Sequence, residues 1–360
     1  VEAAKQLIAR CEAELLTNPP PARLARLHYE IARLCERPVH DPRKASAHYQ
    51  QAYDRAPDHL PTIRGLRRTL IVRRALKQAL PLFDAEARLT SDPALKARLL
   101  FAKGRLLEDG LALRSEAQKT YRTALDLAPN DPTLLKALEQ CDLAAEEWAE
   151  LALTYARQAN AAEGDPKQRA ALLIRRAQVL ETRLGDPEGA IAQYETALEL
   201  DELALDAVEA LKRLYYARSR FRDLVRVLEF EASQSEEPRL RTAALYAIAR
   251  IHADRLGNRP DAIHALERAL AQSPHERLLL EELAQLKEAA REYRGLTQVL
   301  SQMVDALGDA PDRTGVLHRI GQIFEEYLAD PEQARGWFER ALRVDPCYVP
   351  ALQALGNLYA

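Results

Sequence analysis

The sequence predicts an all-α protein, a right-handed superhelical solenoid of about 20 antiparallel helices arranged in pairs. A short helical motif with Ala, a large side chain and Ala at offsets 0, 4 and 7 occurs five times. Successive copies begin at Ala45, Ala117, Ala190, Ala262 and Ala334, and so steady a period is typical of repeat proteins. Ala, Leu, Arg and Glu dominate the composition; these residues favour helices, and no segment shows the alternation of a β-strand.

Each copy of the motif is predicted to form the structural core of one helix pair. The two small residues let neighbouring helices approach closely, and the large residue fills the space between pairs. A large side chain at either small position would overpack this contact. The predicted core residues are Ala45, Tyr49 and Ala52; Ala117, Tyr121 and Ala124; Ala190, Tyr194 and Ala197; Ala262, Leu266 and Ala269; and Ala334, Phe338 and Ala341.

Helix boundaries can be followed along the chain from Pro and Asp. Residues 1–16 form a first predicted helix, which the three prolines after Asn18 end. A second helix over 22–36 leads to Asp41 and Pro42, an N-cap followed by a residue suited to the first helical turn. The second copy has Leu113 at the place of Asp41, so we expect that cap to be missing.

These features resemble the tetratricopeptide repeat, a family of 34-residue helix pairs. Its pattern has small residues at positions 8, 20 and 27, a large residue at position 24 and Pro at position 32. Ala45, Tyr49, Ala52 and Pro57 match positions 20, 24, 27 and 32, and the other copies match in the same way, except that Glu202 replaces the Pro in the third. The resemblance implies a helical solenoid that binds proteins, often in a groove lined by the first helix of each pair.

The period, about 72 residues, indicates a double unit, in which a TPR-like pair alternates with a divergent pair. The divergent pairs carry a bulky residue at a constant offset: Leu76, Trp148, Phe221 and Tyr293. Roughly four extra residues per period are expected to lengthen the first helix of each TPR-like pair. At position 8 the divergent pairs have Arg67, Glu139 and Lys212 in place of a small residue, which predicts a local change in curvature.

We expect a single TPR-like solenoid over residues 1–360, an internal part of a longer array. Helix 1–16 resembles a second helix without its first, and residues 348–360 a first helix without its second. The repeat units are 1–17 (half a pair), 22–92, 93–164, 165–236, 237–310 and 311–360 (incomplete).

Charge and composition argue against several classes of protein. Residues 1–180 carry a net charge of +6 and residues 181–360 a net charge of −9, and neither half has the basic stripe of a nucleic-acid-binding protein. No apolar run is long enough for direct membrane insertion. Four widely spaced cysteines favour small apolar filler in a reducing compartment such as the cytoplasm.

No catalytic, cofactor-binding or metal-binding motif is present. The sequence lacks Gly-rich phosphate loops, the zinc-protease motif and the nucleophile elbow. The eight histidines are scattered without helical ligand spacing and are expected at the surface or in loops. Adjacent glutamates such as Glu281 and Glu282 point apart on a helix and indicate solvated faces. The sequence therefore predicts that the chain is not an enzyme.

Candidate binding residues come from the groove positions of the first helices. In the divergent pairs, positions 5 and 9 are polar and one helical turn apart. Arg64, Arg68, Lys136 and Arg175 would form a basic stripe suited to an acidic peptide or a chain-terminal carboxylate, unless they are ordinary solvated side chains. The candidate groove residues are Arg64, Arg68, Lys136, Gln140, Arg175, Glu209, Arg213, Glu281, Gln285 and Asn357.

In the TPR-like pairs, position 9 is instead apolar in every copy. This recurrence indicates a structural role in packing the extra helical turn, with an apolar ligand stripe as the alternative. The residues are Leu34, Leu106, Val179, Ile251 and Ile323.

The function that the sequence favours is a non-enzymatic protein–protein interaction scaffold of bacterial type. Its partner proteins would bind in the groove as peptide segments or as surfaces. One alternative is a regulatory or substrate-recruiting arm of a larger enzyme. Another is a structural spacer that self-associates through uncapped ends, with Leu352 and Tyr359 at the contact.

Overall fold

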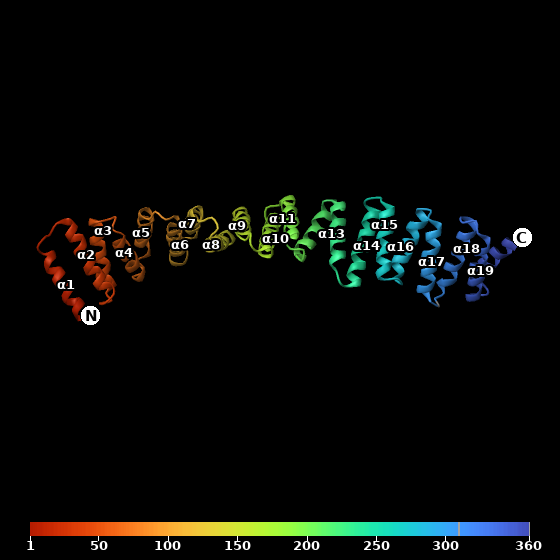
Figure 1. Cartoon of the computed structure of the whole chain (residues 1–360), viewed down its shortest axis with the longest axis horizontal. Coiled ribbons are helices and arrows are strands. Elements are labelled where there is room, and N and C mark those ends of the chain that lie inside the picture. Colours follow the sequence, from red (N-terminus) through yellow and green to blue (C-terminus); the bar gives the residue numbers. More distant parts are fainter. Residues whose placement is uncertain (309, 360) are drawn as a thin grey trace. The chain divides into compact units, whose positions relative to one another are not determined.

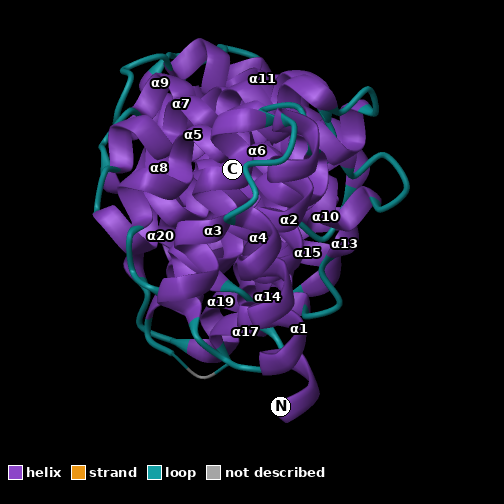
Figure 2. Ribbon diagram, turned by 90° about the vertical axis from the view of Figure 1, so that its left-hand side faces the viewer, coloured by secondary structure: helices purple, strands orange, loops and turns teal. Residues whose placement is uncertain are grey.

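The computed structural model describes residues 1–308 and 310–359. These residues form twenty α-helices and one π-helical turn, with no strand among them (Figures 1 and 2). The chain divides into two compact units, which are Val1–Ala204 and Leu205–Ala360. Within each unit a helix packs mainly against its neighbours along the chain, as in a repeat array. The predicted all-α repeat fold is therefore confirmed.

The first unit contains helices α1 to α11. Antiparallel TPR-like pairs (α2–α3, α6–α7 and α10–α11) alternate with divergent pairs (α4–α5 and α8–α9). The bounds are α1 Glu2–Leu15, α2 Pro21–Glu36, α3 Pro42–Arg55, α4 Leu60–Val72, α5 Leu76–Leu89, α6 Pro93–Arg105, η1 Leu106–Gly110, α7 Arg114–Leu127, α8 Pro132–Ala144, α9 Trp148–Ala161, α10 Pro166–Thr182 and α11 Pro187–Leu200.

The second unit contains helices α12 to α20 and continues the same alternation. Its TPR-like pairs are α14–α15 and α18–α19, and its divergent pairs are α12–α13 and α16–α17. The bounds are α12 Leu205–Ala217, α13 Phe221–Gln234, α14 Pro238–Asp254, α15 Arg259–Gln272, α16 Arg277–Ala289, α17 Tyr293–Leu307, α18 Asp312–Glu326, α19 Pro331–Val344 and α20 Val349–Tyr359.

Local sequence explains where the second helices of the TPR-like pairs begin. The side chain of Asp41 accepts backbone N–H groups at the start of α3, and Asp186 does the same for α11. Pro42 and Pro187 follow, where the missing N–H costs nothing. Helix α7 has Leu113 at this place and no side-chain cap, as the sequence predicts. The first helices α2, α10, α14 and α18 have 15 to 17 residues, whereas α4 and α8 have 13, as the expected lengthening requires. Helix α6 is the exception, with 13 residues, and the π-helical turn η1 continues it.

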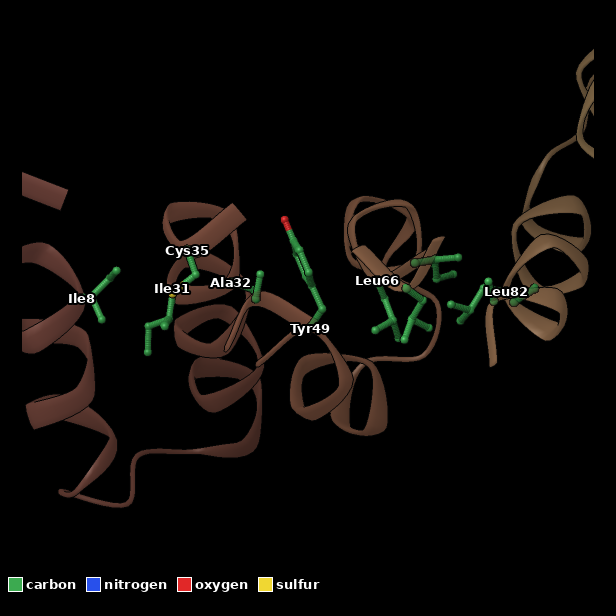
Figure 3. Close-up of a cluster of buried hydrophobic side chains, with 12 residues drawn as sticks. Ile8, Ile31, Ala32, Cys35, Tyr49, Leu66 and Leu82 are labelled. Atoms are coloured by element: carbon green, nitrogen blue, oxygen red, sulfur yellow. The ribbon is translucent and has the colours of Figure 1, made fainter. Parts of the chain in front are cut away.

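The core of the first repeat is organised around the Tyr49 ring, which lies between α2 and α4 (Figure 3). Tyr49 is 1% exposed, and Ala45 and Ala52 beside it on α3 are equally buried. A Cβ atom on Gly65 of α4 would lie 2.3 Å from the Tyr49 ring, so this contact tolerates no side chain. The ring therefore packs directly on the backbone of the next helix pair.

The remaining core motifs are buried in the same way. Each of the two small residues and the large residue in every copy is at most 2% exposed, and this holds for Ala117, Tyr121 and Ala124; Ala190, Tyr194 and Ala197; Ala262, Leu266 and Ala269; and Ala334, Phe338 and Ala341.

The bulky polar residues at position 8 of the divergent pairs each bind a side chain on the paired second helix. Arg67 pairs with Glu86 at 2.9 Å, and Lys212 pairs with Glu231 at 3.0 Å. Between them in the chain, Gln158 donates a hydrogen bond to Glu139 at 2.9 Å. In each case the partner lies 19 residues further on. The space that a small residue leaves in a TPR-like pair is thus filled here by a cross-helix polar contact.

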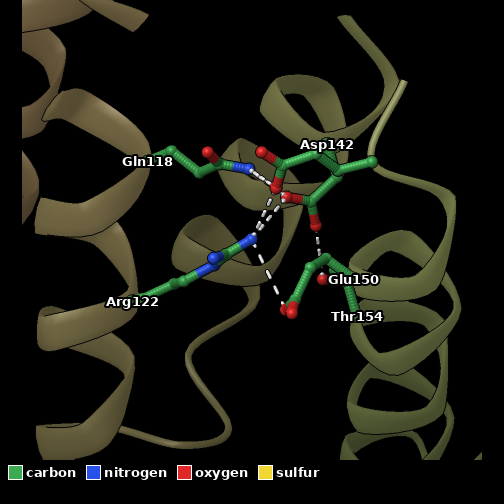
Figure 4. Close-up of polar contacts among 6 residues, drawn as sticks. Gln118, Arg122, Asp142, Glu150 and Thr154 are labelled. Atoms are coloured by element: carbon green, nitrogen blue, oxygen red, sulfur yellow. Dashed lines mark hydrogen bonds and ion pairs between the residues drawn. The ribbon is translucent and has the colours of Figure 1, made fainter. Parts of the chain in front are cut away.

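A buried polar network joins the second TPR-like pair to the divergent pair that follows (Figure 4). Asp142 of α8 is 1% exposed and accepts hydrogen bonds from Gln118 of α7 at 2.7 Å and Thr154 of α9 at 2.8 Å. Arg122 of α7 lies 3.4 Å from the same carboxylate and 2.9 Å from Glu147. The network satisfies a carboxylate that would otherwise be costly to bury.

Candidate functional site

A basic cavity of about 500 Å³ lies between α2 and α4 in the first unit. It receives residues from three consecutive helices, because α3 contributes the Tyr49 edge to the floor. Four arginines and one carboxylate are in its lining, so its formal charge is strongly positive. The lining consists of Tyr29, Arg33, Leu34, Glu36, Arg37, Pro38, Tyr49, Pro61, Arg64 and Arg68.

Two of these arginines, Arg64 and Arg68, are candidate groove residues from the sequence, and the structure brings them together here. Both also have a carboxylate partner within the chain. Arg64 Nε lies 2.6 Å from Glu86, and Arg68 grips both oxygens of Glu36, with Nη2 at 2.7 Å from Oε2. Both arginine side chains remain about half exposed and can still contact a ligand.

Arg33 and Arg37, on the α2 side of the cavity, have weaker contacts with carboxylates of the chain. Arg33 pairs with Glu30 one turn earlier, at 3.0 Å and at the surface, where such pairs contribute little. Arg37 is exposed and has no carboxylate partner among residues 1–308 and 310–359. Arg37 is thus the cation of the cavity that is most available to an incoming anion.

Tyr49 and Glu36 form the polar floor. The Tyr49 hydroxyl donates a hydrogen bond to Glu36 at 2.8 Å. Burial and this hydrogen bond raise the pKa of the Tyr49 hydroxyl above its ordinary value. Burial opposes ionisation of Glu36, but hydrogen bonds from Arg68 and Tyr49 outweigh it and lower the pKa of that carboxyl. The negative charge of Glu36 at the floor is therefore neutralised by Arg68. The remaining positive charge of the cavity lies on the arginines at its rim.

The other candidate groove residues lie at the surface of first helices but outside this cavity. Lys136 and Gln140 are exposed on α8, as are Arg213 on α12, Gln285 on α16 and Asn357 on α20. Among these residues, Arg175 of α10 lies 3.7 Å from Glu139, Glu209 lies 2.6 Å from Lys212, and Glu281 lies 2.5 Å from Arg277. Of the predicted basic stripe, only Arg64 and Arg68 line the same cavity.

The structure also identifies groove residues that sequence analysis missed. In the TPR-like pairs, the small residue that receives the large core residue lies 17 positions before it, whereas the family pattern has 16. The clearest cases are Gly104, where an added Cβ would lie 2.2 Å from Tyr121, and Gly321, where it would lie 2.4 Å from Phe338. In these pairs the register of the first helix therefore differs by one residue from the register of the family pattern.

Because of this one-residue shift, the apolar residues predicted at groove position 9 turn toward the core, and the residues before them lie at the surface. Ile323 is 4% exposed and belongs to the core, and Val179 and Ile251 are nearly as buried. The surface positions are instead occupied by Arg33 and its equivalents, one residue earlier. Counting back 20 positions from each large core residue would have found a series of half-buried large side chains, one turn before these surface positions: Tyr29, Phe101, Ile174, Tyr246 and His318.

Histidine and cysteine depart from expectation at two places. The Nδ1 atoms of His28 on α2 and His48 on α3 lie 3.0 Å apart and half-buried, although surface or loop positions are predicted. Cys347 is exposed, so the expectation of apolar filler fails there, while Cys35 and Cys141 are buried.

Over residues 1–308 and 310–359, no group of three potential metal ligands comes together. No helix in the same described part has the length and apolar character needed to cross a bilayer.

Comparison with protein families identifies one segment of the chain. Residues 170–202, which cover most of α10, all of α11 and the turn between them, match the family model of the tetratricopeptide repeat. The chain therefore contains a tetratricopeptide repeat within a longer helical repeat array. No curated protein matches the sequence.

Several solved structures of tetratricopeptide repeat proteins are similar to this chain. One is YrrB, described as a TPR protein with an unusual peptide-binding site, at 20% identity over 55% of this chain and 98% of YrrB, with a TM-score of 0.30. Another is a TPR protein from Parabacteroides merdae, at 16% identity over 73% of this chain and 99% of that one, with a TM-score of 0.30. A third is the TPR domain of P58(IPK), at 17% identity over 93% and 97%, with a TM-score of 0.26.

Proposed function

We propose that this chain is a non-enzymatic protein–protein interaction scaffold, and that the cavity between α2 and α4 binds a carboxylate-bearing peptide segment of a partner protein. The observation that carries the proposal is the cluster of Arg33, Arg37, Arg64 and Arg68 around one cavity of about 500 Å³. The tetratricopeptide repeat at residues 170–202 supports the scaffold role, because repeats of this family generally bind other proteins.

The chemistry of the lining defines the ligand. Arginine binds carboxylates through two parallel hydrogen bonds, and the partly free guanidinium groups at the rim favour such an anion. Tyr29, Leu34 and Pro61 supply apolar surface next to these charges. A peptide with Asp, Glu or a terminal carboxylate beside an apolar residue would satisfy both parts of the cavity.

The test uses a short fluorescein-labelled peptide that ends in acidic and apolar residues, titrated against the full chain by fluorescence anisotropy. Replacing Arg37 by Gln should weaken binding about three- to tenfold, since it removes one charge-assisted contact. Arg43→Gln, an equal charge change at an exposed position on α3 outside the cavity, should leave the affinity unchanged. Higher salt should weaken wild-type binding through a slower association rate.

Two versions of the peptide separate the sources of the carboxylate. Amidation of the C-terminus removes only the terminal carboxylate, whereas replacing Asp and Glu by Asn and Gln removes the side-chain ones. Equal binding of the acidic peptide and of a peptide without any carboxylate would contradict the proposal. Equal effects of Arg37→Gln and Arg43→Gln would also contradict it, because the charge of the whole chain would then explain the binding.

A further inference from the structure

A second basic cavity, of about 470 Å³, lies among α17, α18 and α19 in the second unit. Its lining includes Trp337, Arg340 and Arg343 from α19, and apolar side chains from all three helices. Arg313 of α18 adds a third cation and Asp305 of α17 a single carboxylate, so the formal charge of the lining is positive. Arg340 stacks on Trp337, with its guanidinium carbon 4.4 Å from the ring centroid. This half of the sequence is acidic, so the positive charge is a local feature.

The equivalent place in the preceding TPR-like pair holds an ion pair. There Arg268 of α15 binds Glu229 of α13 through two parallel contacts of 2.7 and 2.8 Å. Arg340 lies one repeat period after Arg268, and the residue one period after Glu229 is Ser301. The arginine is thus kept, but its carboxylate is replaced by a hydroxyl that cannot carry charge.

Arg340 and Arg343 are exposed and have no carboxylate partner in the part of the chain that the structure describes. Two further replacements accompany the loss of the carboxylate. Trp337 stands where the preceding pair has Ala265, and Arg343 stands where it has Ala271. An aromatic platform and a second cation therefore appear at the same site where the carboxylate disappears.

We propose that this cavity is a second binding site, in which a carboxylate from an acidic peptide segment of a partner protein takes the place that Glu229 holds in the preceding repeat. Arg268 grips that carboxylate with two parallel contacts, and Arg340 at the equivalent position offers the same two donors. Stacking on Trp337 holds the Arg340 guanidinium plane in place. Apolar lining residues would contact an apolar residue next to the carboxylate: Val304, Leu317 and Val344.

The site can be observed through its own tryptophan. The chain has two tryptophans, so in a Trp148→Phe background Trp337 is the only source of tryptophan emission. Phe already stands at the place equivalent to Trp148 in the next divergent pair, as Phe221, which makes this background a mild change. A short peptide of Asp, Glu, Leu and Ser should shift Trp337 emission saturably, and the same peptide with Asn and Gln should not.

Ser301→Glu restores the internal carboxylate and is the decisive variant. It should weaken peptide binding at least about tenfold, because Arg340 then has the partner that Arg268 has. Ser301→Gln has nearly the same size without the charge and should bind like the parent. Arg340→Gln should weaken binding to a similar degree, and Arg268→Gln should not. Circular dichroism melts of each variant report whether the fold is kept.

The proposal is overturned if Ser301→Glu and Ser301→Gln bind equally well, or if the amide peptide changes Trp337 emission as the acidic one does. Arg37→Gln keeps this site intact, so its emission titration should equal that of the parent. Loss of binding in the first cavity and loss of binding at Trp337 are therefore measured separately.

Discussion

Two junctions between a TPR-like pair and the divergent pair that follows it use opposite charges at the same places. In the first unit, Asp142 of α8 faces Arg122 of α7. In the second unit, Lys287 of α16 faces Glu267 of α15, with Lys287 Nζ 2.7 Å from the carboxylate. Asp142 and Lys287 are two periods apart and nearly fully buried, at 1% and 7% exposure. These two junctions therefore use the same two places with the signs exchanged. The other two junctions have Gln50 with Leu70 and Glu195 with Tyr215 there, so the repeat itself does not require a charged pair.

The two junctions differ in how the buried charge is held. Asp142 has two nearly buried partners, Gln118 and Thr154, while the equivalent residues around Lys287 are the apolar Ile263 and Val299. Lys287 relies on two half-exposed carboxylates, Glu267 and Glu292. Burial opposes the charge of Lys287, but these carboxylates outweigh it and raise its pKa. The same buried place thus holds a charge of either sign in these two junctions, and its surroundings decide how costly the removal of that charge is.

Charge reversal should produce the largest effect. Asp142→Lys places a second cation against Arg122 in a buried position, and we expect it to lower the free energy of unfolding by about 3–5 kcal/mol. Adding Arg122→Glu recreates the arrangement of the second unit and should recover a large part of this loss. Urea denaturation followed by circular dichroism measures both. A double variant no more stable than Asp142→Lys alone would show that the two junctions are not equivalent.

Neutral replacements of Asp142 and Lys287 should lower the free energy of unfolding by smaller amounts, and these amounts should differ between the two junctions. Asp142→Leu leaves the buried Thr154 hydroxyl without its acceptor and the Gln118 amide with Glu147 alone, which should cost about 2–3 kcal/mol. Lys287→Met should cost less than about 1 kcal/mol, because Glu267 and Glu292 are about half exposed and stay hydrated. The same denaturation experiment compares them, and equal losses would contradict the proposed difference in surroundings.

Exchanging Tyr and Phe at the core aromatic positions, Tyr121 in the first unit and Phe338 in the second, should have smaller effects on stability. The Tyr121 hydroxyl donates a hydrogen bond to Glu108, 13 residues earlier, at 2.9 Å. Tyr121→Phe should therefore lower stability by about 1 kcal/mol. Phe338 has Glu325 at the same offset, so Phe338→Tyr should be tolerated within about 0.5 kcal/mol. A large loss in Phe338→Tyr, measured by thermal melting, would mean that the two cores differ in shape as well as polarity.

The smallest expected effect depends on pH and concerns the first repeat. His28 occupies a place where the other four TPR-like pairs have Leu, and burial lowers the pKa of both His28 and His48. Their mutual repulsion and the cations Lys44 and Arg55 act in the same direction, while Glu12 on α1 opposes them. The unfolded chain therefore binds protons more readily, and stability should fall as the pH drops below about 6.5.

Replacing both histidines by the residues of the second copy removes this dependence. His28→Leu with His48→Thr should reduce the loss of stability between pH 7 and pH 5, by less than about 1 kcal/mol. Denaturation midpoints at the two pH values, for the parent and the double variant, provide the measurement. A parent protein whose midpoint does not change over this range would contradict the prediction.

Local sequence determined the parts of the fold that depend on neighbours along the chain. Alanine and aromatic residues at fixed offsets are enough to predict the second helices, because close helix packing needs small residues at those places. Asp41 and Asp186 mark helix starts for an equally local reason, since an N-cap bonds to the next turn. The longer first helices follow from a repeat period that exceeds the combined length of two TPR pairs, each of about 34 residues.

The candidate sites depended on contacts that local sequence does not show. The packing role predicted for the apolar residues at position 9 agrees with the burial of Val179, Ile251 and Ile323. Their register relative to the groove differs, because one extra residue in each TPR-like pair rotates the whole first helix. Arg64 and Arg68 were found from their spacing, but their partners Glu86 and Glu36 lie 22 and 32 residues away. The pairing of His28 with His48 was missed for the same reason, since the two residues meet only when α2 and α3 pack together.

The repeat, its period, the small residues of its core and the class of fold can thus be predicted from the sequence, because these follow from spacing along one helix. Which arginines keep an internal carboxylate depends on how the helices pack. Arg268 and Arg340 have the same position in their repeats, yet one binds Glu229 and the other faces Ser301 from a different helix. Charge pairing between helices depends on distance in space, and the periodic pattern of one helix does not contain it.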